Sequence, residues 1–89
     1  MTRTSKQKPA QKANLKEVNS LLDICLAECY LKNDSALSRM LEVSPSAISK
    51  LRNGTQFPSA SFLVSIHENI GISFDRMRKI LNVGFDYKF

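Results

Sequence analysis

Apolar residues recur every three or four positions between residues 14 and 81, the spacing that places them along one face of a helix. The pattern predicts an all-α fold of five short helices, over about residues 14–31, 34–41, 45–53, 59–70 and 73–81. The predicted apolar face of the first helix comprises Leu15, Val18, Leu22, Cys25, Leu26 and Cys29. Those of the last two comprise Phe62, Leu63, Ile66 and Ile70, and then Phe74, Met77, Ile80 and Leu81.

The predicted boundaries coincide with residues that start or stop helices. Asn and Ser side chains cap helix N-termini by accepting a backbone N–H, and glycine adopts the left-handed conformation that ends many helices. Pro45 stands at the first position of the third helix, where its missing N–H costs nothing. The predicted N-caps are Asn14, Asn33, Ser44 and Ser73, and the predicted stops are Gly54 and Gly71.

Residues 34–53 join two of these helices through a three-residue turn, Glu42-Val43-Ser44. Two helices joined in this way form a helix-turn-helix, whose second helix lies in the major groove of DNA. The outer face of that second helix carries Ser46, Ser49 and Lys50, which suit base edges and phosphates. The residues expected to face one core are Leu37, Leu41, Val43, Ile48 and Leu51.

The two ends of the chain differ from its helical middle. Residues 1–13 contain no large apolar side chain after Met1, so we expect a flexible basic arm that reaches phosphates through Lys6, Lys8 and Lys12. In residues 83–89 large side chains alternate with small or polar ones, which is the period of a strand. We therefore expect an arm (1–13), a helix-turn-helix domain (14–82) and an extended tail (83–89).

The tail predicts how two copies associate. An exposed apolar strand tends to pair with another edge, so we expect a symmetric homodimer joined by two tails. Two alternatives stay open. The tail folds back on the first and fifth helices of its own chain, or the dimer contact lies on the fifth helix at Phe74, Met77 and Arg78. The predicted interface residues of the tail are Val83, Phe85, Tyr87 and Phe89.

Composition narrows the range of partners. The 89 residues make one domain, and the net charge of +5 favours a polyanion such as nucleic acid. No apolar run approaches the roughly 20 residues that span a bilayer, and the N-terminus lacks the apolar stretch of a signal peptide. We expect a cytoplasmic protein with no membrane partner.

Catalytic and metal-binding chemistry has little support in the sequence. Cys25 and Cys29 lie one helical turn apart and are predicted to be reduced core thiols. A zinc site would need two more ligands, and the only histidine, His67, is expected at the surface. No Ser/His/Asp spacing, glycine-rich phosphate loop or paired carboxylates stand out. We expect no enzyme activity, cofactor, metal or small-molecule ligand.

The stretch from Leu37 to Gly54, LSRMLEVSPSAISKLRNG, resembles the helix-turn-helix of the Cro/lambda-repressor (XRE-type) family of phage and bacterial regulators. The resemblance covers about residues 14–81 and implies a five-helix, lambda-repressor-like DNA-binding domain in a bacterial cell or phage-infected host. The segment Lys6-Gln7-Lys8-Pro9 is similar to the arm that wraps the duplex in phage repressors.

Three residues depart from the family pattern. Ser38 replaces the usual Ala, and the two are similar in size. Glu42 replaces the usual Gly of the turn, and a non-glycine residue at positive φ costs of order 1 kcal/mol. Asp34 replaces the usual Gln, and its carboxylate would repel phosphate, so the Gln contact is not carried over. Asp34 instead suits the positive end of its helix.

Pattern and resemblance together predict a Cro-type repressor that binds a palindromic operator in double-stranded DNA as a dimer. For Asn53 and Thr55, hydrogen bonding within the loop is the alternative to a phosphate contact. A different functional class is an antitoxin-type module that binds a toxin protein and autoregulates its operon. The predicted base contacts are Ser46, Ser49 and Lys50, and the predicted phosphate contacts are Ser44, Arg52, Asn53, Thr55, Lys6, Lys8 and Lys12.

Overall fold

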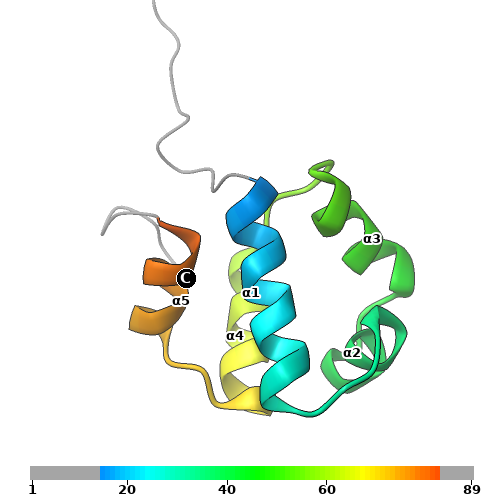
Figure 1. Cartoon of the computed structure of the whole chain (residues 1–89), viewed down its shortest axis with the longest axis horizontal. Helices are drawn as coiled ribbons and strands as arrows, with labels where there is room; N and C mark the ends of the chain where they lie inside the picture. Colours follow the sequence, from blue (N-terminus) through cyan, green and yellow to red (C-terminus); the bar gives the residue numbers. More distant parts are fainter. Residues whose placement is uncertain (1–14, 83–89) are drawn as a thin grey trace, which may run out of the picture.

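The computed structural model describes residues 15–82, and these residues form five α-helices and no strand (Figure 1). The helices are α1 (Leu15–Glu28), α2 (Asp34–Leu41), α3 (Pro45–Asn53), α4 (Ala60–Ile70) and α5 (Phe74–Leu81). The predicted all-α fold is confirmed for this part of the chain. Outside the described residues lie Asn14, the arm with Lys6, Lys8 and Lys12, and the tail with Val83, Phe85, Tyr87 and Phe89.

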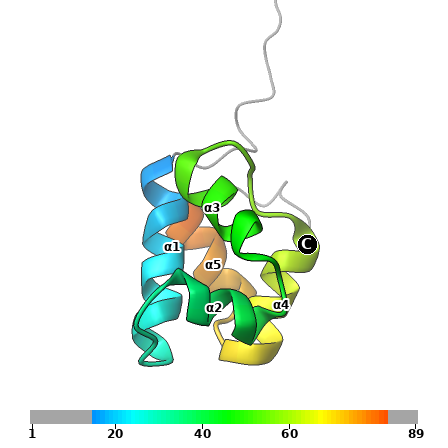
Figure 2. The same cartoon turned by 90° about the vertical axis from the view of Figure 1, so that its right-hand side faces the viewer.

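Helix α1 stands at the centre of the domain and contacts each of the other four helices (Figures 1 and 2). Its buried side chains are Val18, Leu21, Leu22 and Cys25. Leu21 is absent from the predicted apolar face, whereas Leu15 belongs to that face but is 47% exposed. A helix with neighbours on several sides buries more than one stripe, so a single periodic face understates its core surface.

One hydrophobic core joins all five helices. Fully burying a Leu, Ile, Met or Phe side chain contributes roughly 1.5–3 kcal/mol. Some residues predicted for the core are only partly buried, among them Val43, Ile70, Phe74 and Ile80. None of the helices within residues 15–82 is long and apolar enough to cross a membrane. Besides the α1 residues, the core comprises Leu37, Leu41, Ile48, Leu51, Phe62, Leu63, Ile66, Ile72, Met77 and Leu81.

Side-chain caps begin four of the helices, and three of these caps, Asn33, Ser44 and Ser73, were predicted from the sequence. Asn33 accepts a hydrogen bond from the backbone N–H of Ala36, and Ser44 accepts one from that of Ala47. Ser73 does the same for α5, and Ser59 caps α4, which begins one residue later than predicted. Each such cap contributes about 1 kcal/mol relative to alanine.

Helix α1 ends at Glu28, earlier than the predicted end near Leu31. Tyr30 adopts the left-handed conformation with φ of 54° and donates its N–H to the Ala27 carbonyl. Leu31 donates its N–H to the Leu26 carbonyl at 2.9 Å. These bonds form a Schellman motif, in which the apolar residue after the turn packs back on the helix. Leu31 therefore reaches the core through a turn and not through a helical position.

The turn between α2 and α3 has the same form. Glu42 has φ of 58° and ψ of 42°, and Val43 donates its N–H to the Ser38 carbonyl at 2.9 Å. The positive φ considered from the sequence is therefore present at a non-glycine residue, and the Glu42 side chain is exposed. The left-handed conformation costs about 1–2 kcal/mol for a residue with a Cβ atom.

Glu42→Gly should be more stable than Glu42→Ala by roughly 0.5–1 kcal/mol, because glycine relieves the left-handed strain that alanine keeps. Both variants remove the carboxylate, so their comparison isolates the backbone. Urea unfolding followed by circular dichroism measures the difference. Equal stabilities of the two variants would contradict the presence of strain at this turn.

Candidate nucleic-acid interface

Helix α3 lies at the edge of the domain, on the side of α1 opposite α5 (Figures 1 and 2). Its residues Ile48 and Leu51 are buried in the core, whereas Ser46, Ser49 and Lys50 are exposed. The division of this helix into a buried apolar face and an exposed polar face is as predicted. The exposed face combines two hydroxyls with one ammonium group.

The N-terminus of α3 is held by its own serines. The Ser44 hydroxyl accepts the Ala47 N–H at 3.2 Å and is hydrogen bonded to the Ser46 hydroxyl, also at 3.2 Å. Both serines are exposed. The cap therefore orients the Ser46 side chain and leaves these hydroxyls at the surface, beside the positive end of the helix dipole.

The loop after α3 orients a second pair of polar side chains. The Asn53 carbonyl oxygen Oδ1 accepts the Thr55 backbone N–H at 3.0 Å and also accepts the Thr55 hydroxyl. Because a backbone N–H can only donate, the acceptor must be Oδ1, which leaves the Asn53 amide Nδ2–H₂ directed away from this turn. Asn53 and Thr55 thus hydrogen bond to each other within the loop, which is the alternative to a phosphate contact that the sequence left open. The Asn53 amide still presents a donor at the exposed surface.

Arg52 turns inward from the same helix and joins α3 to α1 and α2. Its guanidinium donates two parallel hydrogen bonds to Asp34, from Nε to Oδ2 and from Nη2 to Oδ1, each 2.9 Å long. Its Nη1 lies 2.9 Å from the Asp23 carboxylate and 2.8 Å from the Asn19 Oδ1. Asn19 also donates its amide to the Arg52 carbonyl at 3.1 Å. We call Arg52, Asp34, Asp23 and Asn19 the Arg52 cluster.

The electrostatics of the Arg52 cluster favour the charged form of the arginine. The hydrogen bonds that Arg52 donates to Asp34 raise the pKa of Arg52 above its ordinary value, and Asp23 adds to this effect against the opposing cost of partial burial. The Arg52 side chain is only 22% exposed, compared with 38% for Asp34 and 67% for Asp23. The paired, less exposed Asp34 is therefore the stronger partner.

The sequence suggested that Asp34 interacts with the dipole of its helix. In the structure Asp34 also binds the Arg52 guanidinium. The Arg52 cluster also includes two α1 residues, Asn19 and Asp23, that were not singled out in the sequence. Their spacing of four residues places them on the same side of a helix. Their contact with Arg52 could not be predicted from that spacing, because it forms only when α3 packs against this side of α1.

The side chains of His67 and Cys25 make contacts within the domain. The exposed His67 hydrogen bonds through Nδ1 to the Ile72 carbonyl at 3.0 Å and stacks on Phe74, with ring centroids 4.4 Å apart. Burial raises the pKa of the Cys25 thiol to about 12, and Cys29 adds to that effect, so Cys25 is an unreactive core thiol. No group of His, Cys, Asp and Glu residues within 15–82 could hold a metal ion.

The basic residues of α5 lie on the opposite side of the domain from α3. Arg76 lies 3.4 Å from the Glu28 carboxylate, and Arg78 lies 3.5 Å from that of Asp75. The Arg76–Glu28 pair is exposed on both sides, and such pairs contribute little, typically below about 1 kcal/mol. Lys79 is exposed on the same helix. Arg76 and Lys79 are therefore solvated, whereas Arg78 is partly buried.

Comparison with known proteins adds no assignment. No protein-family model matches the chain, and neither the curated proteins nor the solved structures contain a significant match to it.

Asp34→Asn should lower the free energy of unfolding by about 1–2 kcal/mol, because the amide cannot sustain two charge-assisted hydrogen bonds. Asp23→Asn should cost less than about 1 kcal/mol, since that carboxylate is more exposed. Arg52→Lys should resemble Asp34→Asn, because an ammonium cannot form the paired geometry. Urea unfolding measures all three variants, and an Asp23 effect larger than that of Asp34 would contradict the ranking.

Proposed function

We propose that the chain is a sequence-specific DNA-binding transcriptional regulator whose helix α3 docks in the major groove. The observation that carries this proposal is the outer face of α3, where Ser46, Ser49 and Lys50 are all exposed. The opposite face of the helix packs on the core through Ile48 and Leu51, which are buried. The major groove of B-DNA admits a helix and presents a distinct donor and acceptor pattern for each base pair. Lys50 would donate to guanine acceptors, and the two hydroxyls can donate or accept.

Contacts with the phosphate backbone would set the register of α3. Ser44 stands at the start of the helix, and Asn53 and Thr55 stand just beyond its end, so the base-reading face is flanked by hydrogen-bonding groups on both sides. The arm lysines Lys6, Lys8 and Lys12 would add non-specific electrostatic affinity. Arg52, expected among the phosphate contacts, is assigned here to positioning α3, because Asp34 and Asp23 already hold its guanidinium.

The proposed regulator acts as a homodimer on a palindromic operator. Each copy reads one half-site, and the two α3 helices then lie about 34 Å apart along the duplex. Occupancy of such a site blocks polymerase, which makes repression of the Cro type the simplest mechanism. The five-helix arrangement with α2 and α3 as the reading unit supports a lambda-repressor-like domain.

Selection of bound duplexes from a random pool tests the proposal. We expect an enriched motif with two-fold symmetry and half-site centres about 10 base pairs apart. A helical, folded protein that enriches no sequence would overturn sequence-specific binding. If the same protein captured a toxin from its native host while no duplex was enriched, the antitoxin-type alternative would replace the proposal.

Lys50→Ala should weaken binding to the selected site by roughly 1–3 kcal/mol and relax specificity at one or two base pairs. Lys79→Ala is the matched control, since Lys79 is also an exposed helical lysine but lies on α5. Fluorescence anisotropy with selected and random duplexes measures both variants. Equal weakening on the two duplexes would show that Lys50 contacts phosphate and not a base.

Deletion of residues 2–13 should flatten the dependence of binding on salt. Each lost phosphate contact reduces the slope of log affinity against log salt concentration by about 0.9. The deleted segment carries Arg3, Lys6, Lys8 and Lys12. Affinities measured over a series of salt concentrations give the slope, and an unchanged slope would exclude the arm from the interface.

A further inference from the structure

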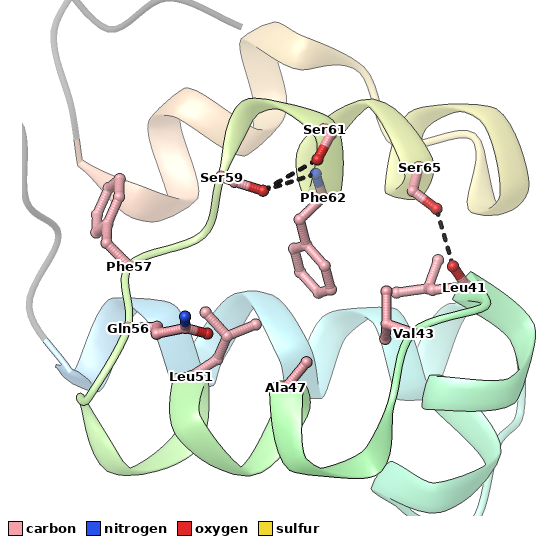
Figure 3. Close-up of a pocket in the computed structure, with 10 residues that line it drawn as sticks. All are labelled: Leu41, Val43, Ala47, Leu51, Gln56, Phe57, Ser59, Ser61, Phe62 and Ser65. Atoms are coloured by element: carbon pink, nitrogen blue, oxygen red, sulfur yellow. Dashed lines mark hydrogen bonds between the residues drawn. The ribbon is translucent and has the colours of Figure 1, made fainter.

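An apolar groove lies between α3 and α4 (Figure 3). Phe62 points into it from α4, while Ala47 and Leu51 point into it from α3. The groove exists because α3 packs on α1 and α2 and makes no comparable contact with α4. It encloses about 330 Å³ and is lined by Leu41, Val43, Ala47, Leu51, Gln56, Phe57, Ser59, Ser61, Phe62 and Ser65.

A second hollow of about 220 Å³ continues this groove toward the start of α1. The two hollows share Leu51, Gln56 and Phe57, and the second adds Leu15 and Val18. Leu15 is 47% exposed. Together the hollows form one groove from α2 to the start of α1, lined by both apolar and polar side chains, which we call the α3–α4 groove.

The tail begins at the end of the domain where the α3–α4 groove opens. In Figures 1 and 2 the end of α5 lies at the same end of the molecule as the start of α1 and the loop that joins α3 to α4. Residues 83–89 follow α5 and its cap, Asn82. When extended they span about 23–25 Å.

The sequence of the tail suits an apolar groove. An extended segment places alternate side chains on opposite faces. One face of this tail would carry Gly84, Asp86 and Lys88 and would suit solvent. The other would carry Val83, Phe85, Tyr87 and Phe89, and each buried aromatic ring removes about 150–250 Å² from water.

We propose that residues 83–89 fold back across the end of α5 and bury Phe85, Tyr87 and Phe89 in the α3–α4 groove of their own chain. Docking within one chain is favoured because a short tether holds the tail at millimolar effective concentration. A second copy at micromolar concentration competes poorly with it. Ser61 and Ser65 line the groove, and their hydroxyls hydrogen bond within the domain, that of Ser61 with Ser59 and that of Ser65 with the Leu41 carbonyl.

This arrangement differs from the strand pairing between two copies that the sequence suggested. A tail held in its own groove leaves the contact between copies to another surface, of which α5 was the alternative. On that helix Met77 is fully buried and is therefore unavailable, whereas Phe74 and Arg78 are only partly buried. The proposal does not depend on DNA binding, and its test contains no DNA.

The chain has no tryptophan, so Tyr87→Trp introduces a single fluorescent reporter in the full-length protein. A docked tail should give blue-shifted emission and at least a twofold reduction in quenching by acrylamide relative to the unfolded chain. Both values should stay constant from low micromolar to several hundred micromolar protein, since docking occurs within one chain. Sedimentation over the same range reports the oligomeric state.

Substitutions in the groove provide the matched comparison. In the Tyr87→Trp background, Phe57→Ala and Ser61→Glu should shift the emission to the red and restore quenching. Ser61→Glu places its charge in the first turn of α4, where a carboxylate is favourable, and circular dichroism verifies that the helices remain. Ser61→Ala should leave the emission unchanged. So should Tyr30→Ala, which removes an aromatic ring that is 94% exposed outside the groove.

Three outcomes would overturn the proposal. A solvent-exposed tryptophan in the parent reporter would show that the tail is not docked. A tryptophan that is buried but insensitive to both Phe57→Ala and Ser61→Glu would place the tail outside the groove. Burial that appears only with rising concentration, in step with dimer formation in sedimentation, would place the tail on a second copy.

Discussion

The paired hydrogen bonds between Arg52 and Asp34 are the constraint on which the candidate interface depends. Helix α3 has nine residues, too few for a stable isolated helix, so its direction must come from its neighbours. Buried Ile48 and Leu51 hold it on the core, but apolar burial is not directional. The planar guanidinium is directional, and it ties the end of α3 to α2 through Asp34 and to α1 through Asp23.

A helix held in this way has little backbone freedom left to lose on binding. Preorganisation of this kind improves affinity without adding contacts, because the ordering cost is already met in the free protein. The Arg52 charge is compensated by its carboxylate partners, so Lys50 and the basic arm supply the cations of the proposed interface. The residue that orients α3 is therefore distinct from the residues that we propose to read DNA.

The helices could be predicted because local chemistry determines them. Ser44 and Pro45 define the start of α3 from sequence alone, and the positive φ at Glu42 was considered from the family pattern of the turn. The Arg52 cluster could not be predicted, because its partners stand 18 and 33 residues away and no periodic pattern links them. The α3–α4 groove also depends on tertiary packing, since it arises only because α3 packs on α1 and α2.

Backbone-amide NMR of the uniformly labelled protein, titrated with a duplex, tests the central claim most directly. The account predicts that the largest shift changes fall on the exposed face of α3, at Ser46, Ser49 and Lys50, and in the loop at Asn53 and Thr55. The amides of α5 should remain unchanged. Shift changes confined to α4 and α5, or the absence of any change at duplex concentrations well above that of the protein, would contradict it.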